Sequence, residues 1–109
     1  MKKDMEIHNK LVRSKVIEKL KRKRIDHTFH LANKTQYDKG LHEKLLEEAQ
    51  EFVQARTKQE MADVQEVVRQ LVIYHGWDPT EIEKIRLEKF EKEGGFDQPI
   101  ILDTCEKKA

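Results

Sequence analysis

Five acidic residues in the middle of the chain have the types and spacing of metal ligands. They are Glu47, Glu48, Glu51, Glu60 and Asp63. Within this set, two pairs are each three positions apart, which places both members of a pair on the same face of a helix. Carboxylates that face one another repel, so that either their pKa values rise or they bind a cation. Mg²⁺ binds carboxylate oxygens and often shares its remaining positions with phosphates. The pattern therefore predicts metal-assisted phosphate chemistry.

Two amphipathic helices are expected to position the acidic pairs. The first, over about residues 36–55, has an apolar stripe made of Leu41, Leu45, Ala49 and Phe52, widened by Leu46 and Val53. The second, over residues 57–75, has a stripe made of Val64, Val67, Val68 and Leu71. Glu48 and Glu51 lie beside the first stripe, where a carboxylate needs a compensating partner. An antiparallel hairpin of these helices would bring them close to Glu60 and Asp63.

Glu60 has a second interpretation. Thr57 and Glu60 fit a capping box, in which the glutamate side chain bonds back to the amide of the residue that caps the helix. Asp63 also suits the positive end of a helix dipole. From the residues alone, both the cap and the metal ligand remain open for Glu60.

Two further helices complete an expected all-α, four-helix bundle. The first begins with Ser14 as its cap and runs to about Lys23. The last runs from Pro79 to about Lys92, after a stop at Gly76 and a cap at Asp78. Its apolar residues Ile82, Ile85 and Phe90 are expected to face the core. Short extended segments are expected near 26–31 and 96–103, the second packed on the core.

Length and charge limit the possible classes of protein. The 109 residues predict a single domain, 1–109, with its core at about 9–103. The 22 basic and 21 acidic residues give a net charge of +1, so no stable nucleic-acid complex is expected. The basic run 21–24 fits either a solvated helix end or a phosphate-attracting patch. Cys105 is the only cysteine, which excludes an internal disulfide. Without a long apolar run, a soluble, cytoplasmic protein is expected, with no membrane span.

Four sequence blocks together resemble one family. They are Asn9 to Val16, Lys44 to Glu48, Met61 to Val67, and Lys89 through Gly94-Gly95-Phe96 to Leu102. With the acidic motif, these blocks are similar to the all-α nucleoside triphosphate pyrophosphohydrolases, in the MazG-like and phosphoribosyl-ATP pyrophosphohydrolase-like superfamily. The blocks span nearly the whole chain, and their order is more specific than the acidic motif alone.

The resemblance implies an enzyme, an Mg²⁺-dependent hydrolase that cuts a nucleoside triphosphate between the α and β phosphates. Mn²⁺ is a possible substitute for Mg²⁺. The implied metal ligands are Glu48, Glu51, Glu60 and Asp63, with Glu47 as an additional ligand. The implied phosphate-binding residue is Lys89, while Arg13, Lys15 and Lys92 are further candidates for binding substrate. The resemblance also implies a homodimer or a homotetramer, and a house-cleaning role for the hydrolysis of nucleotides.

Two residues depart from the family pattern. Ser14 stands where this branch usually has Asp, and Glu93 stands where an Arg commonly precedes the paired glycines. The second change removes a positive charge near the expected phosphate site. Two alternatives therefore stay open: a phosphoribosyl-ATP pyrophosphohydrolase of histidine biosynthesis, and a non-enzymatic helical module that binds a nucleotide or a protein partner. Candidates for stacking on a base are Phe29, Tyr37, Phe52 and Trp77.

Overall fold

The chain folds into helices and loops. The computed structural model describes residues 4–107, and within this range it contains four helices and no strand. They are α1 (Val16–Arg22), α2 (Lys34–Ala55), α3 (Lys58–Tyr74) and α4 (Pro79–Glu93). The expected all-α class is confirmed, and the segments near 26–31 and 96–103 form loops. None of the helices in residues 4–107 is long and apolar enough to cross a lipid bilayer.

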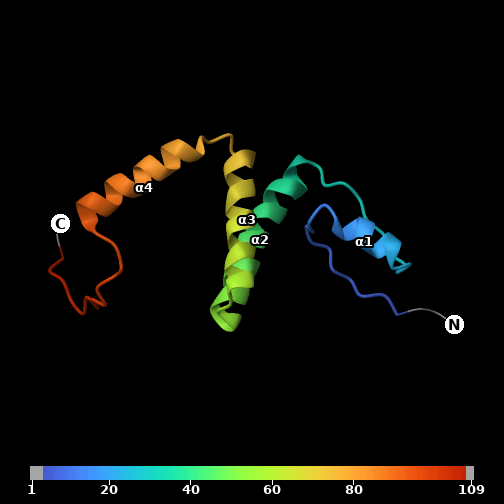
Figure 1. The fold of residues 1–109 in the computed structure, drawn as a ribbon, viewed down its shortest axis with the longest axis horizontal. Helices are drawn as coiled ribbons and strands as arrows, with labels where there is room; N and C mark the ends of the chain where they lie inside the picture. The colour runs from blue at the N-terminus through green and yellow to red at the C-terminus, as the bar shows by residue number, and fades with distance from the viewer. Residues whose placement is uncertain (1–3, 108–109) are drawn as a thin grey trace.

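Helices α2 and α3 form an antiparallel hairpin at the centre of the molecule (Figure 1). A capping box starts α2, in which Asn33 accepts from the Gln36 amide and the Gln36 side chain accepts from the Asn33 amide. The turn is tight because Arg56 adopts a left-handed conformation, with φ of 55°, and Thr57 immediately caps α3. Two residues thus reverse the chain and set the acidic end of α2 beside the start of α3.

The core of the hairpin is small. Its buried apolar residues are Leu41, Val67 and Leu71, and the partly buried residues packed against them are Leu11, Tyr37, Leu45 and Tyr74. The expected stripes are confirmed at their centres. Leu46 and Val53, which widen the first stripe, and Val68 of the second stripe are exposed, contrary to expectation, because no other helix of the described chain packs extensively against them.

Helix α4 diverges from the hairpin (Figure 1). Its boundaries agree with the sequence: Gly76 has φ of 72°, and Asp78 Oδ1 accepts from the Thr80 amide at 2.9 Å. The expectation that its apolar residues face a core of the same chain is wrong. Ile82, Ile85 and Phe90 are 37%, 63% and 52% exposed, because α2 and α3 are the only helices in residues 4–107 that pack extensively together.

The segment that precedes α1 lies against the hairpin. The expectation that Ser14 caps α1 is wrong. Lys15 occupies the cap position instead, and its side chain makes no capping bond. Leu11 packs against the buried core instead, and a methyl group added at Gly40 would meet the Leu11 Cβ at 3.4 Å. This contact brings residues 10–14 next to the acidic residues of α2 and α3. The apolar tail residues Ile100, Ile101 and Leu102 are exposed, so the tail is not packed on the core.

Candidate metal and phosphate site

The acidic residues that the sequence singled out meet across the α2–α3 interface. Their carboxylates form two groups of three. Within a group, each residue contributes one oxygen, and these oxygens all lie within 4.8 Å of one another. The first group is Glu47, Glu48 and Glu51, and the second is Glu48, Glu60 and Asp63. Glu48 belongs to both groups, and it links the carboxylates of α2 to those of α3. Carboxylate oxygens at this spacing are the donor set that a hard divalent cation prefers.

Glu48 is the most buried of these acids, with 8% of its surface exposed. Its Oε2 atom is buried and accepts no hydrogen bond among the described residues. Burial raises the pKa of Glu48, and the charges of Glu51 and Asp63 raise it further. A buried carboxylate without a partner is costly, so this oxygen is well suited to bind a cation. Glu51 is exposed, although the sequence placed it at the border of the core.

The two interpretations of Glu60 can be separated by its side chain. Thr57 Oγ1 accepts from the Glu60 amide at 3.2 Å, so Thr57 does cap α3. The return bond of a capping box is not among the contacts of these residues, and Glu60 Oε2 is buried without a hydrogen-bond partner in the described part of the chain. Burial and then the neighbouring charges of Glu51 and Asp63 raise the pKa of Glu60. Its carboxylate therefore belongs to the acidic cluster.

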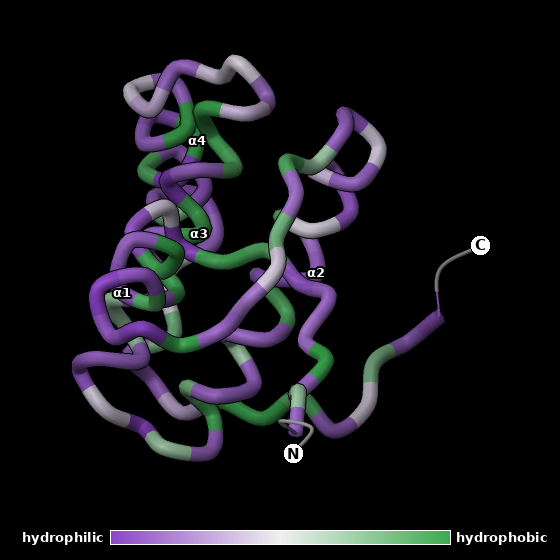
Figure 2. The backbone as a smooth tube through the Cα atoms, turned by 90° about the vertical axis from the view of Figure 1, so that its right-hand side faces the viewer, coloured by the Kyte–Doolittle hydropathy of each residue, from purple (hydrophilic) through white to green (hydrophobic). Residues whose placement is uncertain are grey.

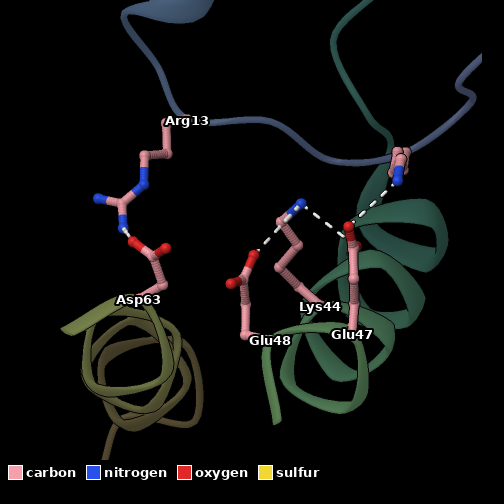
Figure 3. A network of polar contacts seen from close by, with 6 residues as sticks. Arg13, Lys44, Glu47, Glu48 and Asp63 are labelled. Atoms are coloured by element: carbon pink, nitrogen blue, oxygen red, sulfur yellow. Dashed lines mark hydrogen bonds and ion pairs between the residues drawn. The ribbon is translucent and has the colours of Figure 1, made fainter. Parts of the chain in front are cut away.

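Three cations border the cluster, as Figure 3 shows for two of them. Arg13 Nη2 donates to Asp63 Oδ1 at 2.7 Å, which ties residues 10–14 to α3. Lys44 Nζ lies 3.3 Å from Glu47 Oε2 and 3.9 Å from Glu48 Oε1. Lys10 Nζ donates to Glu47 Oε1 at 3.1 Å, and this bond is the main reason why the pKa of Glu47 is lowered. Glu47 has two lysines within 3.3 Å, whereas Glu48 has only the more distant contact with Lys44 at 3.9 Å.

A pocket of about 400 Å³ opens beside the cluster. Residues 11–14 form one wall, and the facing sides of α2 and α3 form the others. Its polar lining residues include Arg13, Lys44, Glu48, Asp63 and Gln70, and Tyr37 lines it as well. The Tyr37 hydroxyl accepts from Gln70 Nε2 at 3.2 Å, which fixes the ring beside the pocket. Of the four aromatic residues proposed to stack on a base, Tyr37 is the one that lines this space.

The other expected substrate-binding residues lie elsewhere. Lys15 occupies the N-cap position of α1 and is not part of the pocket lining. Lys89 and Lys92 are on α4, which leads away from the hairpin, and Lys89 Nζ lies 4.0 Å from Glu93 Oε2. Arg13 alone of this group reaches the acidic cluster within the chain.

Lys10 and Lys44 were not predicted from the sequence. Lys44 is three positions before Glu47 and four before Glu48, a spacing at which opposite charges pair on a helix. That signal was present in the sequence. Lys10 is 37 positions from Glu47, and no local spacing indicates such a contact.

Comparisons with protein-family models, with curated proteins and with solved structures found no match. The resemblance of the four sequence blocks to the pyrophosphohydrolases therefore stays a prediction. The case for a function depends on the geometry of the acidic cluster and its pocket.

Proposed function

We propose that the chain is an Mg²⁺-dependent nucleoside triphosphate pyrophosphohydrolase that releases a nucleoside monophosphate and pyrophosphate, in a house-cleaning role. One observation carries the proposal: Glu48 joins two groups of carboxylates, while buried oxygens of Glu48 and Glu60 have no hydrogen-bond partner among the residues that the structure describes. The particular reaction is proposed because the four sequence blocks resemble those of the pyrophosphohydrolases. A bound divalent ion would offset the negative charge of phosphate oxygens and lower the pKa of a bound water.

The residues around the cluster fit a phosphorylated ligand. Arg13 and Lys44 both line the pocket and carry the positive charge that phosphate oxygens need. Arg13 is 60% exposed in its side chain, so a ligand can reach it. A cation held by Asp63 would weaken its ion pair with Arg13, and Arg13 would then be available to bind phosphate. Tyr37 offers an aromatic face at the same pocket for a nucleobase.

The proposal includes a homodimer or a homotetramer. The accessible surface is 10967 Å², about 1.7 times the value of roughly 6,300 Å² that a compact monomer of this mass exposes. Hydrophobic positions recur along α4, as Figure 2 shows, and they are exposed at Ile85, Leu87 and Phe90. A second copy of the chain would bury this face, and α4 of one copy would bring Lys89 to the acidic cluster of the other.

The test is a panel of nucleoside triphosphates with Mg²⁺, in which pyrophosphate and monophosphate are separated and quantified. Phosphoribosyl-ATP belongs in the panel, because a preference for it would favour the histidine-biosynthesis alternative. Glu48→Gln and Glu60→Gln are expected to lower the rate by at least about 10- to 100-fold, since each removes a proposed metal ligand. Glu43→Gln is the matched control, because Glu43 lies on α2 and pairs with Lys39 instead.

Binding without hydrolysis is a second candidate, favoured by the position of α4. In the single chain, no lysine of α4 lies near the cluster, and Glu93 adds a negative charge beside Lys89. Calorimetric binding of a triphosphate with Mg²⁺ and no pyrophosphate from any nucleotide would support this candidate. Pyrophosphate release that is unchanged in Glu48→Gln and Glu60→Gln would contradict the proposed site.

A further inference from the structure

A pair of histidines lies outside the acidic cluster and takes no part in the proposed hydrolysis. His42 is on α2, and His75 ends α3. His42 is six positions before Glu48, which puts it about 9 Å along the axis of α2 and about 120° around it. The two imidazoles come together across the hairpin, with Nε2 atoms 3.2 Å apart. Two imidazole nitrogens bound at 2.0–2.1 Å to one tetrahedral zinc ion are separated by about 3.3 Å.

The hydrogen bonds of His42 place a lone pair on its Nε2 atom, where a cation could bind in place of the proton of His75. His42 Nδ1 lies 2.6 Å from the backbone oxygen of Asp38. A carbonyl oxygen can only accept, so Nδ1 donates and carries the proton. In the neutral ring, Nε2 is then unprotonated, and it accepts a hydrogen bond from His75 Nε2 at 3.2 Å. This is the arrangement of a metal-binding histidine, whose second ring nitrogen donates to a carbonyl or a carboxylate.

The surrounding side chains hold both rings in place. The His75 ring stacks on Trp77, with centroids 4.4 Å apart and an angle of 14° between the planes. Tyr74 packs edge-on against both histidines, and its hydroxyl donates to Asp38 Oδ1 at 2.9 Å. The Asp38 Oδ2 atom lies 3.9 Å from His42 Nδ1, so a carboxylate lies beside the ring nitrogen that faces away from His75. A preformed pair of ligands loses little freedom when an ion binds.

We propose that His42 and His75 form a binding site for a divalent transition-metal ion of the zinc class. Imidazole nitrogens suit Zn²⁺, Ni²⁺ and Cu²⁺, whereas the carboxylates of the acidic cluster suit Mg²⁺. The His42 side chain is 48% exposed, so that water or a donor from another molecule can complete the coordination. The ion would tie the first half of α2 to the turn that leads into α4.

Trp77 provides a reporter for this site, because it is the only tryptophan and is stacked on a proposed ligand. The experiment titrates Zn²⁺, and separately Cu²⁺, into the full chain with excess Mg²⁺ present to saturate the acidic cluster. We expect a saturable change in Trp77 emission with Zn²⁺ and strong quenching with Cu²⁺. A rise in the midpoint of thermal unfolding with Zn²⁺ gives an independent reading.

His42→Gln is the decisive variant, because it leaves the stacked pair of His75 and Trp77 intact. It is expected to weaken Zn²⁺ binding by at least about tenfold, and His75→Gln is expected to do the same by calorimetry. His27→Gln and His30→Gln are the matched controls. Equal affinity in the wild type and His42→Gln, or an equal loss in the controls, would overturn the proposal. This result is independent of the nucleotide assay, which depends on the acidic cluster.

Discussion

Glu48 and Glu60 each have one buried carboxylate oxygen that accepts no hydrogen bond from residues 4–107. Their pKa values are raised above 4.5, first by burial and then by the charges of Glu51 and Asp63. The neutral forms therefore fit the metal-free fold better than the charged forms. The stability that protonated Glu48 and Glu60 contribute to the fold is fully present below about pH 4.5, and it is lost as the pH rises through their folded-state pKa values. A bound cation would remove this penalty at neutral pH.

A stability measurement of Glu48→Gln tests this account without any substrate. In EDTA, the variant is expected to resist urea better than the wild type at about pH 7, because glutamine is never charged. The advantage should shrink at about pH 4, where the wild-type carboxyl is protonated. Millimolar Mg²⁺ should stabilise the wild type more than the variant. Glu43→Gln serves as the control, and a Glu48→Gln advantage that is the same at both pH values would contradict the assigned cause.

At the scale of single residues, the acidic cluster could be predicted because its members follow helical spacing. Glu48 and Asp63 are each three positions from a second acid, and a short turn joins their helices. The sequence does not decide whether the side chain of Glu60 caps α3 or joins the acidic cluster, because a capping box fits the same residues. The contact of Arg13 with Asp63 spans 50 positions, and its partner could not be read from local spacing.

At the scale of helices, the ends of α2, α3 and α4 are determined by local chemistry. Gly76, which follows the end of α3, has φ of 72°. The Trp77 amide donates to the Val72 oxygen at 3.1 Å, and the Gly76 amide donates to the Ile73 oxygen at 3.0 Å. This is the Schellman arrangement that glycine favours. Such signals are local, and they were predictable from the sequence. Packing of α4 was not predictable, since an apolar stripe does not say which surface it covers.

Two glycine substitutions give opposite expected results. Gly76→Ala is expected to destabilise the fold by about 1–2 kcal/mol, because a side chain disfavours the left-handed conformation. No atom lies within 4 Å of the added methyl group, so the effect is purely conformational. Gly40→Ala, inside α2, is expected to stabilise by about 0.5–1 kcal/mol through helix propensity. Urea unfolding measures both, and a larger loss in Gly40→Ala than in Gly76→Ala would mean that Leu11 cannot accommodate the methyl group at 3.4 Å.

At the scale of the molecule, the chain spans 66 × 32 × 31 Å, and its buried apolar core is small. Exposed apolar residues on α4 predict self-association, which sedimentation velocity would measure. Ile85→Glu is expected to shift the protein toward monomer, since a charge at a buried interface is costly. Thr80→Glu adds the same charge to the same helix at a polar position, and it should not change the assembly. A wild type that stays monomeric at high concentration would contradict the proposed dimer.

The proposed dimer also predicts that two inactive variants restore activity when they are mixed. Glu48→Gln removes a ligand from the acidic cluster, and Lys89→Ala removes the lysine that α4 would supply to the other copy. In a mixed dimer, one site would keep Glu48 from the second variant and Lys89 from the first. Random mixing then restores about a quarter of wild-type pyrophosphate release in the mixture, and about half in the separated mixed dimer, where one of the two sites is intact. If Lys89 instead served the cluster of its own chain, both sites of the mixed dimer would be defective and no activity would return. Co-refolding the two variants in equal amounts and separating the hybrid by charge tags would decide between these arrangements.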